Sequence, residues 1–330
     1  MLLTLRDIQS EPSAVAFGMA PPLFERMSKI LLLCFTAIPW ALSAQPSRQK
    51  TSVVHTGDVD LSYEVHGSSP GVPIIFANGG PGFPLQITSR AAAWSKLAAH
   101  HTLIFYDQRG LGSSRLLRPD APQTLDAQVA DLEALRRSLG AEKIIIAGHS
   151  WGGDIAMGYA AAYPEHVEKM ILIDSARPNW NEESVNTLDA FFPDIRQQAR
   201  DLEKQGDTPE IQDEEYRLHL AMLFYSDGNR RTFENQIKGI KLNHQVNEAN
   251  MNAMKIVDLW PQMKALKIPT LILTGRFDAN IPPSVAWKIH NAIAGSKFVV
   301  FSKSGHFPFV EEPGRFVSVI DEFIQTDLSQ

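Results

Sequence analysis

The residue types and spacing that could do chemistry are clearest in Gly148-His149-Ser150-Trp151-Gly152, a G-x-S-x-G pattern. An apolar β-branched run, Ile144–Ala147, precedes it, and a helix-like run begins at Gly153. A serine on a tight turn between a strand and a helix directs its hydroxyl out of the sheet, and small flanking residues let the backbone close that tightly. The pattern therefore predicts Ser150 as a nucleophile. A glycine-rich turn without chemistry is the alternative.

A serine hydroxyl becomes an effective nucleophile when a neighbouring base takes its proton and an acid orients that base. After a serine in this setting, the expected chain order is serine, acid, histidine. We predict His306 as the base, because it lies in a glycine-bearing loop after the last apolar run. Asp278, at the carboxyl end of the preceding strand-like run, is the first candidate for the acid. Asp174, at the end of an earlier run, is the rival.

The oxyanion that forms during acyl transfer needs two preorganised hydrogen-bond donors. We expect one from the backbone N–H of Trp151, directly after the serine. The other is expected from Gly80, in the turn Asn78-Gly-Gly-Pro-Gly82 that follows an early strand-like run. This chemistry requires no metal ion and no organic cofactor.

Alternating strand-like and helix-like runs must position these residues. Residues 52–55 and 59–66 are expected to open a sheet as an antiparallel pair, and 125–139 has the apolar spacing of a helix with Thr124 as its cap. The buried strands expected after the opening pair are Val72–Ala77, Thr102–Tyr106, Lys143–Ala147, Lys169–Ile173, Thr270–Thr274 and Lys297–Phe301. This alternation predicts an α/β fold, a mostly parallel sheet with flanking helices.

The alternation breaks between residues 176 and 259, a polar and helix-like stretch that is too long for a structureless loop. We interpret it as an inserted helical cap. The predicted organisation is therefore an N-terminal extension with an export signal at 1–44, an α/β core at 45–175 and 260–330, and the cap at 176–259.

The N-terminal region has the composition of a targeting segment. Lys29 precedes the apolar run Ile30–Leu42, which ends near the small residue Ala44 and is too short to span a bilayer comfortably. We expect an export signal cleaved after Ala44, with either Met1 or Met27 as the start, and a secreted or periplasmic protein. Cys34 is the single cysteine and lies within this segment, so the mature chain would form no disulfide.

The charge and composition of the chain limit the classes of partner that it can bind. The formal net charge of −6, with no basic block, argues against general nucleic-acid binding, and 44% hydrophobic residues fit a globular protein with a large core. We expect a small molecule or a short peptide as substrate and no stable membrane span after signal removal. The sequence carries no signal for an oligomeric state.

With Asn78-Gly-Gly-Pro-Gly82, Asp107-Gln-Arg-Gly-Leu-Gly-Ser-Ser114 and Gly148-His-Ser-Trp-Gly-Gly153, the chain resembles the α/β-hydrolase superfamily and, within it, the proline iminopeptidase-like serine peptidases. The resemblance runs from about Ser52 to the C-terminus and is weak in the cap. It implies an α/β-hydrolase fold, an acyl-enzyme mechanism, and Asp107 and Arg109 as braces of the active-site loops. The chain differs from the family pattern at Asn78, where the family usually has histidine.

The substrate depends on the cap. Family peptidases hold the substrate's amino group with cap glutamates, one in a Trp-Glu pair, and the nearest match here is Trp180-Asn-Glu182. Glu214, Glu215 and Glu234 are candidates for that role, and exposed helix glutamates are the alternative. The first functional hypothesis is release of an N-terminal, proline-like residue. The others are an esterase or lactonase on a small acyl substrate, and a non-catalytic receptor with a hydrolase fold.

Overall fold

The computed structural model describes residues 50–182, 187–206 and 208–326. The chain divides into two compact units, residues 1–45 and 46–330, and every described residue belongs to the second unit. The expected export signal, its cleavage point after Ala44 and the alternative start at Met27 lie outside the described residues. Within the described part of the chain, no helix combines the length and the apolar character needed to cross a bilayer.

A mostly parallel sheet forms the centre of this unit. The strand order is β1-β2-β4-β3-β6-β7-β8-β9, with the short β5 paired to β2. The strands are β1 Lys50–His55, β2 Val59–His66, β3 Ile74–Ala77, β4 Leu103–Tyr106, β5 Arg115–Leu116, β6 Ile144–His149, β7 Val167–Ile173, β8 Thr270–Gly275 and β9 Lys297–Phe301. The pairs β1–β2, β2–β4 and β2–β5 are antiparallel, and all later neighbours are parallel.

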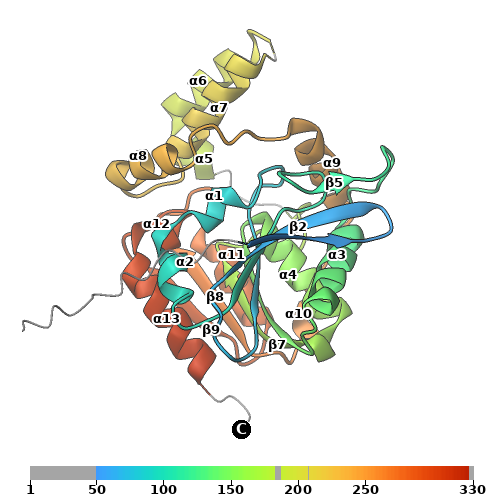
Figure 1. Cartoon of the computed structure of the whole chain (residues 1–330). Helices are drawn as coiled ribbons and strands as arrows, with labels where there is room; N and C mark the ends of the chain where they lie inside the picture. The colour runs from blue at the N-terminus through green and yellow to red at the C-terminus, as the bar shows by residue number, and fades with distance from the viewer. Residues whose placement is uncertain (1–49, 183–186, 207, 327–330) are drawn as a thin grey trace, which may run out of the picture. The chain divides into compact units, whose positions relative to one another are not determined.

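Helices cover both faces of the sheet, which explains why central strands such as β3 and β6 are almost wholly apolar and buried. Along β6, Ile144 and Ile146 face one core while Ile145 and Ala147 face the other. The first core packs against α3 (Leu125–Ser138), α4 (Trp151–Ala162), α10 (Trp260–Ala265) and α11 (Pro283–Ala292). The second packs against α1 (Gln86–Ser89), α2 (Ala92–Leu97), α12 (Pro308–Glu311) and α13 (Pro313–Gln325). Figure 1 shows α2, α12 and α13 on one side of the sheet and α3, α4 and α10 on the other.

The predicted elements differ from the observed ones mainly at their ends. The third strand begins at Ile74 rather than Val72, because Pro73 has no N–H to donate to a ladder. The helix predicted at 125–139 is α3, which Thr124 caps by accepting a hydrogen bond from the N–H of Ala127 at 3.3 Å. The two-residue β5 was not predicted, since so short a strand has no measurable periodicity.

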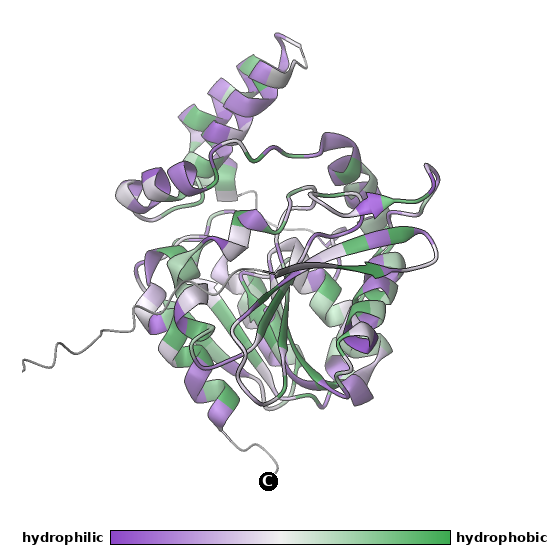
Figure 2. Cartoon of the chain, in the orientation of Figure 1, coloured by the Kyte–Doolittle hydropathy of each residue, from purple (hydrophilic) through white to green (hydrophobic). Residues whose placement is uncertain are grey.

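The segment between β7 and β8 is helical, and its helices pack partly against the core. Its α-helices before α10 are α5 Thr187–Phe191, α6 Pro193–Glu203, α7 Pro209–Ala221, α8 Asp227–Gln236 and α9 His244–Met254. Leu220, Leu223 and Phe233 belong to the same apolar cluster as α2 and α13. The outward surfaces of α6 and α7 are largely hydrophilic, whereas the sheet strands are hydrophobic along much of their length (Figure 2).

Candidate active site

Ser150 lies on a sharp turn between β6 and α4, as the sequence pattern predicted. Its backbone has φ 53° and ψ −122°, a conformation that side-chain-bearing residues rarely adopt. The flanking glycines are sterically required. A Cβ on Gly148 would lie 2.2 Å from the carbonyl oxygen of Gly152, and one on Gly152 would lie 2.0 Å from that of Ala77. The turn can close only because both positions lack a side chain.

His306 and Asp278 are joined by a buried hydrogen bond. His306 Nδ1 lies 2.7 Å from Asp278 Oδ2, and both side chains are almost completely buried. The other oxygen, Asp278 Oδ1, accepts hydrogen bonds from the backbone N–H groups of Asn280 and Ile281, each at 2.9 Å. These three donors fix the position of the Asp278 carboxyl group. They also fix the imidazole so that its second nitrogen, Nε2, is left for other contacts.

The backbone of His306 is held on both sides. Its N–H donates to the carbonyl oxygen of Leu223, in the cap, at 2.7 Å. Its carbonyl oxygen lies 2.8 Å from Nε2 of His149, the residue before the candidate nucleophile. Glu311 adds a further tie, since its carboxylate accepts from the N–H groups of Gly305 at 2.6 Å and Ser226 at 2.8 Å. The candidate base is therefore positioned jointly by the core and the cap.

The turn predicted to supply an oxyanion-hole donor lies beside the serine. A Cβ on Gly79 would lie 2.8 Å from His149 Nδ1 and 3.1 Å from Ser150 Cβ, so only glycine fits there. The Asn78 side chain braces this turn by donating to the carbonyl oxygens of Gly79 and Phe83, each at 2.9 Å. Asparagine thus has a structural role at the position where the family usually has histidine.

Gln108, which sequence reasoning did not single out, joins the two segments that carry the predicted oxyanion-hole donors. Its Nε2 donates to the carbonyl oxygen of Asn78 at 2.8 Å, and its Oε1 accepts from the Trp151 indole N–H at 2.9 Å. Asp107 accepts from the N–H groups of Leu85 at 2.7 Å and Ser113 at 2.8 Å. Asp107 therefore braces the loop that follows the glycine turn.

Arg109 acts at a greater distance from the serine. Its guanidinium forms a bidentate pair with Asp131 of α3, at 2.8 and 2.9 Å, and donates to the carbonyl oxygen of Pro122. Both partners of the pair are buried, so removal of either one would leave an uncompensated charge. Arg109 thus ties the loop after β4 to α3.

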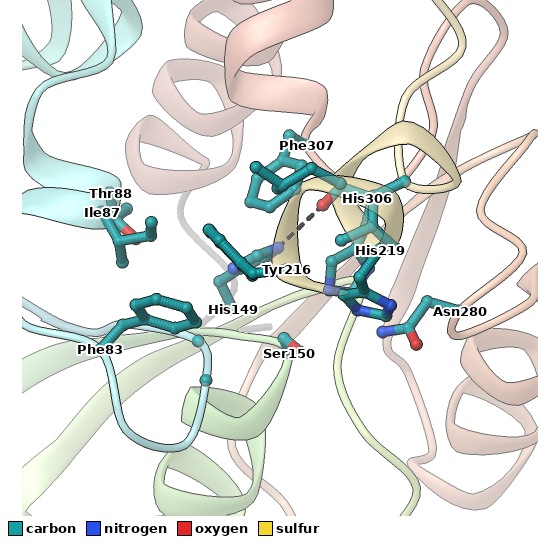
Figure 3. A pocket seen from close by; sticks show the side chains of 14 residues that line it. Phe83, Ile87, Thr88, His149, Ser150, Tyr216, His219, Asn280, His306 and Phe307 are labelled. Carbon is teal, nitrogen blue, oxygen red and sulfur yellow. Dashed lines mark hydrogen bonds between the residues drawn. The ribbon is translucent and has the colours of Figure 1, made fainter. Parts of the chain in front are cut away.

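Ser150 opens into two adjoining cavities. The smaller, of about 80 Å³, is mostly apolar and also contains His306 (Figure 3). Its other lining residues are Gly79, Gly80, Phe83, Ile87, Thr88, His149, Tyr216, His219, Leu220, Leu223, Asn280 and Phe307. The larger, of about 340 Å³, is lined by Gly80, Ser150, Trp151, Ala176, Arg177, Trp180, His219, Met251, Asn280 and Ile281. Gly80, His219 and Asn280 line both cavities and so surround the serine.

Comparison with known proteins gives the family of this chain. Residues 72–313 match the family model described as the α/β-hydrolase fold, which is more than half of the chain. The chain belongs to the α/β-hydrolase family. In sequence it is similar to a proline iminopeptidase of Saccharolobus solfataricus, 30% identical over 281 residues that cover 79% of this chain and 87% of the relative.

Solved structures of the same fold extend the comparison for this α/β-hydrolase. An esterase of Exiguobacterium antarcticum superposes with a TM-score of 0.67 at 21% identity, covering 84% of this chain and 100% of the esterase. An enol-lactonase of Burkholderia xenovorans LB400 superposes with a TM-score of 0.66 at 21% identity and the same coverage. At this identity the likeness concerns the fold.

Two further histidines of this α/β-hydrolase face the candidate base. Burial, followed by the nearby His306, lowers the pKa of His219 to about 4, and the same causes hold the pKa of His149 well below its usual range. Both imidazoles are therefore neutral near pH 7. His219 comes from the cap helix α7, and its sequence context, a histidine between two leucines, gives no sign that it borders the serine.

The cap glutamates predicted to bind an amino group lie elsewhere in the hydrolase. None of Glu214, Glu215 and Glu234 is among the residues that line the two cavities at Ser150. Glu214 forms an ion pair with Arg217, and Glu234 pairs with Arg230 at 2.6 Å. Glu215 lines a third cavity together with Arg196 and His244, and this cavity shares Tyr216 and His219 with the smaller cavity at Ser150.

Three side chains of the kinds that can bind a metal ion lie together in the described part of the chain, namely Asp174, Asp278 and His306, with one polar atom of each within 4.8 Å of the others. Asp174 Oδ1 accepts from the N–H of Gly275 at 2.8 Å, and Asp278 accepts from His306 and from two backbone N–H groups. Both rival acids are therefore at the site, and Asp278 is the one that hydrogen-bonds to the histidine. Only two of the three side chains, Asp278 and His306, are hydrogen-bonded to each other.

Asp154 supports the wall of the larger cavity. It lies on α4 one turn after Ser150, is fully buried, and accepts a hydrogen bond from the Trp180 indole N–H at 3.2 Å. Trp180 packs edge-on against Trp151, with ring centroids 6.0 Å apart. Among the described residues, the second oxygen of Asp154 has no donor, and burial raises the pKa of its carboxyl well above the ordinary value.

Replacement of Asp154 by asparagine is expected to reduce the loss of stability at alkaline pH. A carboxyl whose pKa is raised by folding stabilises the protein below its unfolded pKa of about 4, and this contribution is lost as pH rises through the folded pKa. Asparagine does not titrate and still accepts from Trp180. We expect the free energy of unfolding, measured in urea at pH 5 and pH 9, to fall less in Asp154→Asn than in wild type.

The exposed Asp120 provides the control, because Asp120→Asn should leave the pH dependence of unfolding as it is in wild type. An equal fall in wild type and Asp154→Asn between the two pH values would contradict a raised pKa at Asp154.

Proposed function

We propose that this α/β-hydrolase is a serine hydrolase that acts through an acyl-enzyme. The observation that carries the proposal is that Ser150, on a strained turn, opens into a cavity that His306 also lines, while His306 Nδ1 is bound to the buried Asp278 carboxylate. This arrangement leaves His306 Nε2 as the nitrogen that accepts the serine proton.

In the proposed reaction, Ser150 Oγ attacks the substrate carbonyl as its proton passes to His306 Nε2. Asp278 stabilises the imidazolium, and the N–H groups of Gly80 and Trp151 bind the tetrahedral oxyanion. As the first residue of α4, Trp151 has an N–H that no residue of its helix accepts, and the positive end of the helix dipole lies there. The imidazolium then protonates the leaving group, which departs and leaves the acyl group on Ser150. Water attacks this acyl-enzyme with His306 as the base, and the carboxylic acid is released as Ser150 regains its proton.

The charge of the cavities favours an uncharged ester or lactone over a peptide with a free amino terminus. An ammonium group removed from water needs a carboxylate partner. Among the described residues, neither cavity at Ser150 is lined by Asp or Glu, and the larger one is lined by Arg177. His219, on both cavities, is neutral near pH 7. These observations support the esterase or lactonase hypothesis above the aminopeptidase hypothesis.

The apolar cavity suits a small acyl chain. Phe83, Leu220, Leu223 and Phe307 are buried side chains that border it. Burial of each added methylene contributes about 0.8 kcal/mol, so acyl chains of two to four carbons should gain affinity until the small volume is filled. The wider cavity, with Trp151, Trp180 and Arg177, would then take the alcohol part of the ester.

A panel of chromogenic substrates tests the proposal. We expect p-nitrophenyl acetate and butyrate to be hydrolysed with kcat/KM at least about 100-fold above that of proline p-nitroanilide, since the ammonium group lacks a counter-charge. N-acetylproline p-nitroanilide is the matched control for that charge. Faster turnover of proline p-nitroanilide than of both esters and the acetylated control would restore the aminopeptidase hypothesis. No turnover of any substrate, with no labelling by a fluorophosphonate in folded protein, would favour the receptor hypothesis.

A further inference from the structure

Asp174, the carboxyl that does not bind His306, has an unusual position for a residue of a plain turn. It follows β7, is fully buried, and has a backbone φ of 41°, in the left-handed region. Aspartate and asparagine tolerate this region better than most residues, yet the conformation still carries strain. Aspartate thus occupies a place where glycine would fit the backbone more easily.

The two oxygens of Asp174 have different surroundings. Oδ1 accepts the N–H of Gly275 at 2.8 Å. Oδ2 is buried and has no donor among the described residues. The carboxyl group lies within 4.8 Å of ligand atoms of both Asp278 and His306. Two buried carboxyl groups therefore lie close together beside the histidine.

The two carboxyl groups differ in the number of donors that they accept from. Asp278 accepts from His306 and from two backbone N–H groups, whereas Asp174 accepts from one. Two adjacent buried carboxylates cannot both ionise, and the one with fewer donors takes the proton. Burial and then the charge of Asp278 raise the pKa of Asp174 well above its ordinary value, in agreement with this arrangement.

We propose that Asp174 is a positioning residue, whose protonated carboxyl donates a hydrogen bond to the Asp278 carboxylate and so fixes the acid that orients His306. The inference rests on the proposed function of Ser150, Asp278 and His306. It assigns a role to the carboxyl that sequence reasoning could treat only as a rival acid. The other ionisable groups that face this set are the imidazoles of His149, whose ring centroid lies 4.7 Å from that of His306, and of His219.

Two variants separate the hydrogen bond from the backbone conformation. Asp174→Asn keeps the shape of the side chain, provides an N–H donor and tolerates the left-handed φ. Asp174→Gly also tolerates the left-handed φ but has no side chain. We expect Asp174→Asn to retain kcat/KM and the acid limb of its pH profile. Asp174→Gly should lower kcat/KM by about tenfold to 100-fold, the loss of a hydrogen bond to a charged group. It should also move the acid limb to higher pH, because the negative charge beside His306 would lose a hydrogen-bond donor that partly offsets it.

Infrared difference spectroscopy of the whole protein gives a readout that needs no substrate. A carbonyl band of a protonated carboxylic acid should be present in wild type and in Ser150→Ala, and its intensity should fall in Asp174→Asn. An unchanged band would overturn the proposal. So would an acid limb that moves to lower pH in Asp174→Asn, because that shift would mean that a negative charge had been removed. If no substrate is turned over, the proposed function fails, while the infrared band still decides the protonation of Asp174.

Discussion

Replacement of Ser150 by alanine is expected to lower kcat on a neutral p-nitrophenyl ester on the order of 10⁶-fold, as loss of the nucleophile does in serine hydrolases. The hydroxyl has no substitute in the reaction proposed for it, and the N–H donors of Gly80 and Trp151 alone supply only residual catalysis. Alanine has the same Cβ as serine at a backbone φ of 53°, so the turn should keep its conformation. Steady-state kinetics and fluorophosphonate labelling measure the loss, and circular dichroism verifies the fold.

Ser175 provides a matched control. It is a buried serine near the same turn, since a Cβ on Gly153 would lie 2.2 Å from its Oγ, and it has no assigned role in the chemistry. The Ser175→Ala variant should still be labelled by the fluorophosphonate, and its kcat should stay within about threefold of the wild-type value. Retained ester hydrolysis in Ser150→Ala, or its loss in Ser175→Ala with the fold intact, would refute Ser150 as the nucleophile.

Replacement of Gly275 by alanine should have the largest effect among substitutions outside the serine turn. The added Cβ would lie 1.9 Å from the carbonyl oxygen of Gly305 and 2.7 Å from that of Ser304, so the backbone of the His306 loop must move. We expect a loss of about 3 kcal/mol or more in the free energy of unfolding. Displacement of the base by about 1 Å should also lower kcat/KM by about 100-fold. Urea unfolding and ester kinetics measure the two effects.

Gly314 provides the matched glycine for this experiment. It lies in α13, and a Cβ there would have no atom within 4 Å. Gly314→Ala should leave the kinetics unchanged and raise stability by up to about 1 kcal/mol, because alanine favours the helix. Equal stability and activity of Gly275→Ala and Gly314→Ala would show that the His306 loop does not depend on the close approach at Gly275.

The sequence allowed the core and the reacting groups to be predicted, because both leave local patterns. Apolar runs such as Ile144–Ala147 mark strands that are buried on both faces, and the chain order of Ser150, Asp278 and His306 follows from where strands end at one edge of a sheet. That three-residue assignment stays a prediction until the variants are measured. The structure adds the hydrogen bond from His306 to Asp278, which separates the first candidate acid from its rival Asp174.

The cap could not be predicted in the same way. Its helices have polar surfaces and few strong anchors, so their sequence indicates that helices form but not which side chains point toward the core. His219 lies beside Ser150, and Glu214 and Glu234 lie in ion pairs away from both cavities, although all three belong to helical runs of similar composition. Contacts such as the one from Gln108 to Asn78 and Trp151 join segments far apart in the chain and leave no local pattern.

The hydrogen bond from the His306 N–H to the carbonyl oxygen of Leu223 has a consequence for selectivity. Leu223 and Leu220 also line the apolar cavity, so in the proposed reaction the wall that would contact the acyl chain also holds His306. A substrate that packs badly against this wall disturbs the alignment of His306 with the serine. We therefore expect acyl groups to differ more in the rate of acylation than in the strength of binding. The helical segment that carries Leu223 would then contribute to selectivity at the chemical step.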